Sequence, residues 1–392
     1  MRSPQHTEVL ILGAGYAGVH AARTARRAGA TVTVVDPTGQ HDLAPRLAAV
    51  AAGRRPAGDA WAPLDALVDA TLVRARAVAI DIDIDIPTVS LDDGRVLHAG
   101  AIVVTVGAGP KLPPVPGLDP TTAWSLRNAA DALRLRTALP EADRLVVVGA
   151  GSTGVQLAAE TASQHPHIDV HLVEAGDRVL GQFDAPLGRG AARVLRDRGV
   201  TVHLATSVDR ADGDGVILSD GTRLDGVVVW ATGVAADGHA LLPDAPTSDG
   251  RLLVDRALRV GGRVLAAGDI AAHRDLLGRV TPPSAQIALQ AGRAAGRNAA
   301  AIADGRMPRA ASLLGLGWIV DLGGQGVAQL GPFDVTAPLV DRVIPVLHEA
   351  IDLRHLWQAG GANAVVEHAT GKHDPTDAQI RRTERPSLRS VS

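Results

Sequence analysis

Two segments of the chain share one pattern of apolar and polar positions. In each, an apolar run leads into a glycine-rich turn and an alanine-rich stretch, and a second apolar run ends in an acidic residue. These segments cover residues 9–36 and residues 145–174. Continuous apolar runs are typical of strands buried in a parallel sheet, and the alanine-rich stretches between them favour helices. The pattern therefore predicts two β-α-β units.

Each turn carries three glycines with the spacing Gly-x-Gly-x-x-Gly. They are Gly13, Gly15 and Gly18 in the first unit and Gly149, Gly151 and Gly154 in the second. The first glycine permits a tight turn, the second lets the backbone approach a pyrophosphate, and the third lets helix and strand pack closely. The N-terminus of the helix that follows each turn presents free N–H groups and a partial positive charge to the phosphates. The acids that end the second strands, Asp36 and Glu174, are placed to accept hydrogen bonds from an adenosine ribose.

One such motif alone is weak evidence, and the alternative is a glycine turn in an α/β domain that binds nothing. Two motifs, each in its full strand-turn-helix-strand context, predict two dinucleotide sites. Two bound nucleotides in turn predict electron transfer between them.

Further apolar runs predict the remaining elements. Residues 71–97 are β-rich, and the alternation of isoleucine and aspartate at 80–86 predicts a half-buried strand with a charged face. Buried strands are predicted at 101–106 and 227–230, a helix within 281–303 that begins after Pro282-Pro283, and two strands around a glycine turn at 318–330. A helical stripe that packs against the core or a second subunit is predicted at Leu339, Val343, Ile344, Leu347, Ile351 and Leu356.

The order of these elements predicts that the second unit is inserted into the first. Residues 1–112 and 236–305 would form an FAD-type domain, and residues 113–235 an NAD(H)-type domain. Residues 306–366 would be a small α+β region at an interface or on the acceptor side, and the polar residues 367–392 a disordered tail. The predicted fold class is α/β, with two Rossmann-like, three-layer (ββα/βα) nucleotide-binding domains.

Composition excludes several kinds of chemistry. The 392 residues carry a net charge of −3 without a basic patch, so no nucleic-acid partner is predicted. The chain has no cysteine, which excludes disulfides, thiolate zinc sites, iron–sulfur clusters and redox-active dithiols, so redox chemistry needs a bound cofactor. His165, His167 and His171 resemble a metal cluster by count alone, and we predict no metal site. Without a signal peptide or an apolar run of ~20 residues, a cytoplasmic location is expected.

The two glycine motifs, which we call fingerprints, are followed in the chain by Ala231-Thr232-Gly233 and Gly268-Asp269. With its motifs in this order, the chain resembles the pyridine-nucleotide flavoprotein oxidoreductases from residue 9 to about residue 303. The resemblance implies FAD at the first fingerprint and NADH at the second. The FAD residues it implies are Gly13, Gly15, Tyr16, Ala17, Gly18, Asp36, Val78, Thr105, Gly107, Gly268, Asp269 and Gln286. The NADH residues it implies are Gly149, Gly151, Ser152, Thr153, Gly154, Glu174, Thr232 and Gly233.

Shorter stretches narrow the resemblance. Residues 33–47 and the run Ala285-Gln286-Ile-Ala288-Leu-Gln290 are similar to type II NADH dehydrogenases and apoptosis-inducing-factor-like quinone reductases, and residues 323–329 to the ferroptosis-suppressor type. This implies that Gln286 and Gln290 position a quinone carbonyl. The alternative is a helix that only packs near the flavin, with both amides bonded to backbone. The long aromatic-rich C-terminal helices that dock type II dehydrogenases are missing, so peripheral contact with the inner face of the cell membrane is not indicated.

The predicted function is the transfer of a hydride from NADH to FAD and of two electrons to a small quinone-type acceptor, with a homodimer as a further expectation. Glu174 predicts NADH over NADPH, because its carboxylate repels a 2′-phosphate. The alternatives are a ferredoxin or rubredoxin reductase, and an apoptosis-inducing-factor-like NADH sensor with slow turnover.

Three aromatic residues complete the predictions. Quinone reduction needs protons, yet His41 is the one candidate acid, and a lone loop histidine is typically a surface residue. Phe183 is expected to lie near the nicotinamide or to anchor a loop, and Trp230 to pack in the core.

Overall fold

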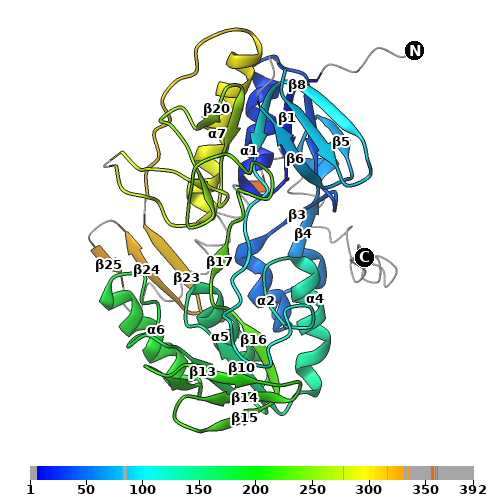
Figure 1. The fold of residues 1–392 in the computed structure, drawn as a ribbon. Coiled ribbons are helices and arrows are strands. Elements are labelled where there is room, and N and C mark those ends of the chain that lie inside the picture. The colour runs from blue at the N-terminus through cyan, green and yellow to red at the C-terminus, as the bar shows by residue number, and fades with distance from the viewer. Residues whose placement is uncertain are drawn as a thin grey trace.

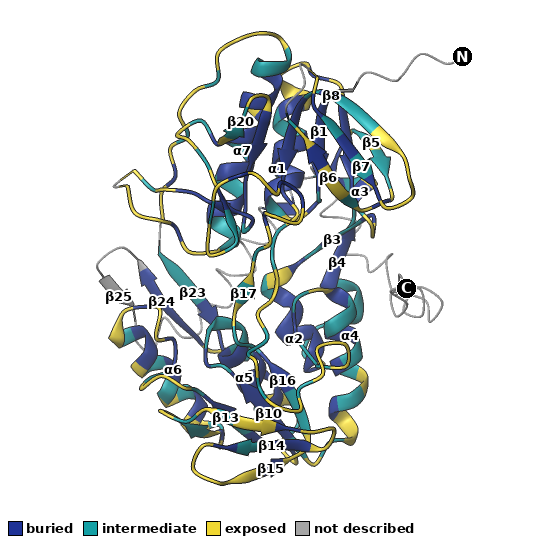
Figure 2. Ribbon diagram, in the orientation of Figure 1, coloured by how far each residue is buried: buried dark blue, intermediate teal, exposed yellow. Residues whose placement is uncertain are grey.

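Two parallel sheets, one above the other in Figure 1, form the framework of the protein in a computed structural model. The structure describes residues 7–82, 86–276, 278–315, 317–330 and 333–335, together with residues 355, 356, 358 and 360. The central strands of both sheets are largely buried, whereas the connecting loops are largely exposed (Figure 2). This arrangement confirms the predicted α/β class with two Rossmann-like sheets.

The first sheet has the central order β20-β21-β8-β1-β2-β5, and its pairs are parallel except β20 with β21. A hairpin of two further strands joins it along β8. The strands are β1 (Thr7–Leu12), β2 (Val32–Val35), β5 (Thr71–Val73), β6 (Ala77–Asp81), β7 (Thr88–Leu91), β8 (Val96–Val104), β20 (Arg259–Gly261) and β21 (Val264–Ala266). The predicted Ile/Asp strand is therefore shorter than expected and ends at Asp81, and residues 83–85 of that run lie outside the described residues.

Two helices, α1 (Tyr16–Arg27) and α7 (Ala285–Ala303), pack closely against each other beside this sheet. Glycines in α7 allow the close approach, because a Cβ at Gly292 would lie 2.1 Å from the Ala17 carbonyl oxygen and one at Gly296 2.2 Å from the Ala21 oxygen. Helix α7 begins after Ser284, whose hydroxyl accepts the Ile287 N–H. The predicted helix thus ends where expected and begins, as predicted, after Pro282 and Pro283.

The second sheet has the order β12-β11-β10-β16 and is parallel throughout. A small antiparallel sheet and four helices accompany it. These elements are β10 (Arg144–Val148), β11 (Asp169–Val173), β12 (Thr201–His203), β16 (Val227–Trp230), β13 (Val208–Ala211), β14 (Gly215–Leu218), β15 (Arg223–Asp225), α2 (Leu47–Ala51), α4 (Ala129–Ala138), α5 (Ser152–Gln164) and α6 (Ala185–Asp197). Trp230 is 4% exposed, as predicted for a core residue.

The two sheets are joined by paired segments. β9 (Gly109–Pro110), where the chain leaves the first sheet, pairs with β17 (Val234–Ala235), where it returns. β3 (Gln40–Asp42) pairs with β4 (Trp61–Pro63) and leads into α2. The other short elements are α3 (Leu64–Leu67), β18 (Thr247–Ser248), β19 (Arg251–Leu253), β22 (Ala271–Ala272) and the 3-10 turns Ala44–Arg46, Ala57–Ala60 and Leu139–Glu141.

The C-terminal part contributes an antiparallel sheet of β23 (Trp318–Asp321), β24 (Gly326–Leu330) and β25 (Phe333–Val335). β23 and β24 flank a turn in which Gly323 and Gly324 have positive φ, which confirms the predicted pair of strands around a glycine turn. Of the predicted apolar stripe, Leu356 is described and buried, and Leu339, Val343, Ile344, Leu347 and Ile351 lie outside the described residues.

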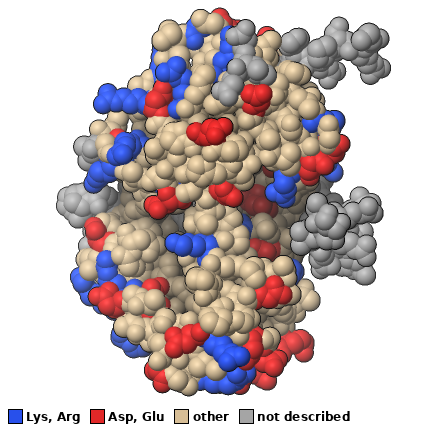
Figure 3. All heavy atoms as spheres, viewed as in Figure 1, with Lys and Arg blue, Asp and Glu red and all other residues tan. Residues whose placement is uncertain are grey.

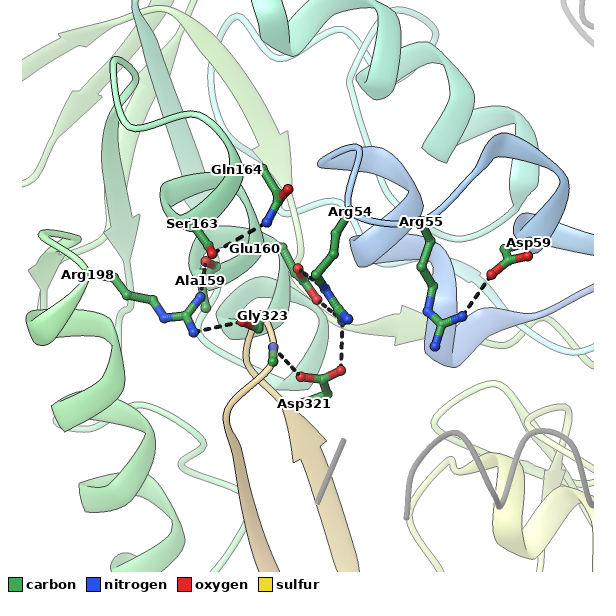
Figure 4. A network of polar contacts seen from close by, with 11 residues as sticks. Arg54, Arg55, Asp59, Ala159, Glu160, Ser163, Gln164, Arg198, Asp321 and Gly323 are labelled. Carbon is green, nitrogen blue, oxygen red and sulfur yellow. Dashed lines mark hydrogen bonds and ion pairs between the residues drawn. The ribbon is translucent and has the colours of Figure 1, made fainter. Parts of the chain in front are cut away.

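A buried ionic network ties three distant stretches together (Figure 4). Arg54, which follows α2, bonds both carboxylate oxygens of Glu160 on α5 and reaches Asp321 on β23 at 2.7 Å. Arg198 adds hydrogen bonds to the carbonyls of Ala159 and Gly323. The C-terminal sheet is therefore held to the second parallel sheet by charge as well as by packing.

Candidate active site

Both glycine turns lie at the carboxyl ends of their strands and have the same geometry. The Gly13 N–H donates to the Val35 carbonyl at 2.8 Å, and the Gly149 N–H donates to the Val173 carbonyl at 2.7 Å. Their φ angles are +90° and +104°, which lie in the region that glycine adopts without steric cost. This confirms the strand-turn-helix context on which both dinucleotide predictions depend.

The middle glycine of each turn faces open space. A Cβ at Gly15 would meet nothing within 4 Å, and one at Gly151 would meet only the Gln182 Nε2 at 3.5 Å. These residues cap α1 and α5, whose first turns contain no acidic side chain and no side-chain cap. Free N–H groups, partial positive charge and space for phosphates therefore coincide, and both sites fit a dinucleotide pyrophosphate.

The third glycine of each turn has a packing role instead. A Cβ at Gly18 would lie 2.0 Å from the Gly13 carbonyl oxygen, and one at Gly154 would lie 1.9 Å from the Gly149 oxygen. Such contacts are too short for any side chain. The middle glycine of each motif thus leaves open space, and the third glycine allows close packing against the turn.

The predicted ribose acids occupy equivalent positions. Asp36 Oδ2 accepts the Ala14 N–H at 3.0 Å, and Glu174 Oε2 accepts the Ala150 N–H at 2.7 Å. The other oxygen of Asp36 accepts the N–H and hydroxyl of Thr38 and the N–H of Gly39. Both acids therefore shape their glycine turns, and Asp36 is the more heavily bonded of the two.

The chain positions further predicted residues beside these turns. The Thr105 hydroxyl bonds the carbonyls of Leu12 and Gly13 at 2.8 Å, and Gly107 follows with a φ of +74°. Thr232 bonds the Lys111 carbonyl, and Gly233 accepts the Lys111 N–H. Each threonine thus stabilises a connection that follows a strand of its parallel sheet, β8 for Thr105 and β16 for Thr232.

The Gly268–Asp269 turn is surrounded by partly satisfied polar groups. Arg127 Nη2 lies 3.9 Å from the Asp269 carboxylate, and its buried Nε has no hydrogen-bond partner among the described residues. The Gly268 N–H donates to His273 Nε2 at 3.2 Å, so the neutral ring carries its proton on Nδ1, which is also buried without a described partner. Burial lowers the pKa of His273 to about 3 and raises the pKa of Asp269. Unpaired buried donors at this turn fit a ligand with polar acceptor atoms.

Comparison with known proteins decides the family. Residues 7–292 match the model of the pyridine nucleotide-disulphide oxidoreductase family. The chain belongs to this family. It is therefore a flavin-dependent NAD(P)H oxidoreductase, and its lack of cysteine means that no disulfide of its own takes part.

Individual relatives give the same picture. The oxidoreductase is 26% identical to a type II NADH:quinone oxidoreductase of Staphylococcus aureus, over 90% of this chain and 96% of that protein. Its fold is similar to NDH2 of Plasmodium falciparum, with a TM-score of 0.77 at 15% identity over 94% and 98% of the chains. A ferredoxin reductase of Rhodopseudomonas palustris gives a TM-score of 0.71 at 24% identity over 83% and 82%.

The expectation of a surface histidine at position 41 is wrong for this oxidoreductase. His41 is fully buried, and its Nδ1 lies 2.9 Å from the carbonyl of Ala14 in the first glycine turn. Its Nε2 lies 2.9 Å from Nε2 of His355, whose Nδ1 lies 3.1 Å from Nε2 of His20. Arg293 Nε lies 3.4 Å from Nδ1 of His20. Sequence reasoning missed this cluster because its members are far apart in the chain.

These contacts fix one set of tautomers. Since a carbonyl accepts, His41 Nδ1 carries the proton, and each ring can then donate to the next if all three are neutral. The donors run in one direction, from Arg293 through His20, His355 and His41 to Ala14. Burial lowers the pKa of His20 to about 3 and that of His41 to about 4, and it also lowers that of His355.

The remaining predicted residues differ in their placement. Tyr16 stacks on His355 at a ring distance of 4.4 Å, Ala17 is buried against α7, and Ser152 and Thr153 lie in the first turn of α5. Val78 lies on β6 and is 43% exposed. Phe183 packs on Trp318 with ring centroids 4.7 Å apart, which favours the loop-anchor alternative.

The two glutamines of α7 are not equivalent. The Gln290 amide donates to the Leu314 carbonyl at 2.9 Å, and its oxygen accepts the Leu314 N–H at 3.0 Å. Its polar atoms are therefore bonded to backbone, the alternative that the sequence left open. Gln286 lies one turn nearer the start of α7.

The described residues contain no group of three or more histidine or acidic residues arranged to hold a metal ion: His165 contacts the Ala52 carbonyl, whereas His171 contacts His203 and Asp169. No helix in the same part of the chain has the length and hydrophobicity needed to cross a membrane.

Proposed function

We propose that the protein takes a hydride from NADH, through FAD, and passes two electrons to a quinone-type small-molecule acceptor. The observation that carries this proposal is the pair of separate glycine turns, each with an open cradle and an acid in the same position. The near full-length relative named a type II NADH:quinone oxidoreductase supports the choice of acceptor.

In this proposal each of the two parallel sheets belongs to the part of the chain that binds one cofactor. Residues 1–112 and 236–305 hold FAD, with Gly13, Gly15 and Asp36 at its adenosine half and Asp269 at the ribityl chain. Residues 113–235 hold NADH at Gly149, Gly151 and Glu174. Bound FAD supplies the chemistry of accepting a hydride and passing on electrons. The chain supplies position: the Thr105 hydroxyl bonds the first glycine turn, whose backbone N–H groups would face the phosphates, and the Thr232 hydroxyl bonds the Lys111 carbonyl beside the β9–β17 pair.

The start of α7 is the proposed acceptor side. Gln286 would position the acceptor carbonyl, and Gln290 would hold the segment near Leu314 against the helix. A homodimer and a cytoplasmic location, with or without contact at the inner face of the cell membrane, stay predictions.

Replacing Gly151 by valine should weaken nicotinamide binding about a hundredfold while the protein stays folded and yellow. The new side chain meets only Gln182 within the protein, so it fills the space of the phosphates and not that of the core. Gly15→Val is the matched variant and should lose FAD instead. Titration of flavin absorbance and NADH binding checks both, and loss of flavin from Gly151→Val would contradict the assignment of the two sites.

NADH should be preferred to NADPH by about tenfold or more in kcat/KM, equivalent to about 1.4 kcal/mol. The reason is the carboxylate of Glu174, which lies at the end of β11 beside the second glycine turn. Steady-state kinetics with both cofactors measures the ratio, and Glu174→Ser should reduce it. A clear preference of the wild type for NADPH would contradict the prediction.

A ferredoxin-type reductase is the second candidate, because a ferredoxin reductase shares the fold over 83% of this chain. Such an enzyme would need a docking surface for a small iron–sulfur protein. On the face shown in Figure 3, acidic and basic side chains are interspersed. Rates with quinone analogues and with a reducible ferredoxin, measured side by side, distinguish the two functions.

A further inference from the structure

One carboxyl group lies between the turns of the first sheet and the helices of the second. Asp42 ends β3, directly after His41, and its Oδ1 accepts the N–H of Ala129, the first residue of α4, at 3.1 Å. Among the described residues this N–H is its one hydrogen-bond partner, and no arginine or lysine lies within ion-pair distance of it. Asp42 is therefore a partly buried acid without a counter-ion.

The charged groups that face Asp42 are two carboxylates and one arginine whose guanidinium contacts other groups. Asp36 lies beyond the end of β2, and Asp131 on α4 already accepts the Ser125 hydroxyl and the Arg127 N–H. The Arg127 guanidinium is directed at the Ala108 carbonyl, 3.4 Å away, and at Asp269. Burial, with Asp36 and Asp131, raises the pKa of Asp42 to about 7 against the opposing effects of the Ala129 N–H and Arg127.

His41 and Arg127, which lie near Asp42, contact three turns at the carboxyl edge of the first sheet. His41 bonds the Gly13–Gly15 turn through Ala14, and Arg127 contacts the turn after β8 at Ala108 and the turn after β21 at Asp269. These are the turns to which the proposed function assigns FAD. Asp42 is thus close to the side of the sheet where that cofactor and the second sheet would meet.

The overall reaction leaves one proton to account for. Reducing a quinone follows NADH + H⁺ + quinone → NAD⁺ + hydroquinone, so the hydride brings two electrons and one proton, and a second proton must be supplied. With two one-electron acceptors, NADH gives NAD⁺, two electrons and one proton that must be released. The chain of His20, His355 and His41 does not suit this exchange, because its nitrogens face one another and it ends at a backbone carbonyl.

We propose that Asp42 is the residue that holds and exchanges this proton. The inference rests on the proposed function, in which FAD lies at the turns around Asp42. It assigns the acid that the sequence did not reveal, and it holds for either class of acceptor, with uptake for a quinone and release for an iron–sulfur protein.

The first test needs no turnover. In Asp42→Asn the amide oxygen still accepts the Ala129 N–H, but the ionisable group is gone. We expect this variant to unfold at a higher urea concentration than the wild type at pH 8 and the difference to shrink toward pH 5, because the wild-type carboxyl is protonated there. Asp65→Asn, which alters an exposed carboxyl on α3, is the matched control. It should unfold at the same urea concentration as the wild type at pH 8 and at pH 5.

The second test is the pH profile of kcat in the FAD-loaded enzyme. At pH 7, Asp42→Asn should lower kcat about a hundredfold, leave the KM for NADH unchanged and remove an inflection near neutral pH. Asp42→Glu, which keeps a carboxyl, should retain an inflection. A yellow Asp42→Asn enzyme with the wild-type profile overturns the proton role alone. A wild-type protein that cannot be loaded with FAD overturns the proposed function and the proton role together.

Discussion

Replacing Arg54 by methionine is expected to lower the free energy of unfolding by about 3–5 kcal/mol. The side chains of Glu160 and Asp321 are only 2% and 8% exposed, and both bond the Arg54 guanidinium. Without this cation two buried carboxylates would face each other, and burial already raises the pKa of Glu160. The cost is that of an uncompensated buried charge, and not the strength of a surface ion pair.

Urea unfolding at pH 7 measures the effect of Arg54→Met. Arg95→Met is the control, because Arg95 pairs with Asp93 at the surface and its loss should cost less than about 1 kcal/mol. Adding Glu160→Gln to Arg54→Met should recover part of the stability, since one of the two unpaired charges is then removed. A cost for Arg54→Met no larger than that of the control would show that the network contributes little.

Lowering the pH from 7 to 5 should destabilise the protein by roughly 5 kcal/mol, comparable with the whole stability of many domains. Burial lowers the pKa values of His20 and His273 to about 3 and of His41 to about 4, and it lowers that of His355 as well. The stability that these neutral rings contribute is fully present above the unfolded pKa of 6.5. It is lost as pH falls toward the folded values, by about 1.4 kcal/mol per pH unit for each histidine.

The acids work in the opposite direction but are fewer. The raised pKa of Asp42, about 7, means that the folded state binds a proton more readily than the unfolded chain, so this residue alone would favour folding as pH falls toward 4. Asp269 and Glu160 act with the same sign. The histidine effect outweighs them because, over the same interval, the four histidines take up protons in the unfolded chain while the buried rings of the folded state stay neutral.

Urea unfolding at pH 5, 6 and 7 checks the acid effect. His355→Gln should flatten the pH dependence, since it removes the middle ring of the cluster, whereas His167→Gln changes an exposed ring and should not. A wild-type stability that is constant between pH 7 and 5 is the result that contradicts the prediction.

Local patterns allowed much of the fold to be predicted. The glycine spacings and apolar runs identified both β-α-β units, and the glycines after Asp321 identified the β23–β24 hairpin. These features depend on residues close in sequence. The sequence predicted that α7 is a helix, but not that it packs against α1. That contact depends on the fit of Gly292 against Ala17, and these residues are far apart in the chain.

Less of the candidate site could be predicted from the sequence, because its contacts also join residues that are far apart in the chain. His41 looked like a loop residue, yet its environment is made by His355, 314 positions later. Gln290 belongs to a motif, but its amide is used by Leu314. Arg127 and Asp42 carry no local signal at all, since their significance comes from Ala108, Ala129 and Asp269.

The glycine contacts between α1 and α7 have a mechanical consequence. At Gly292 and Gly296 the two helix backbones touch, so neither helix can slide or tilt without separating from the other. Helix α1 begins at the first glycine turn, and Gln286 lies in the first turn of α7. The spacing between these two places is consequently fixed by the helix pair, so in the proposed function any adjustment to acceptors of different size would fall to the loops around it.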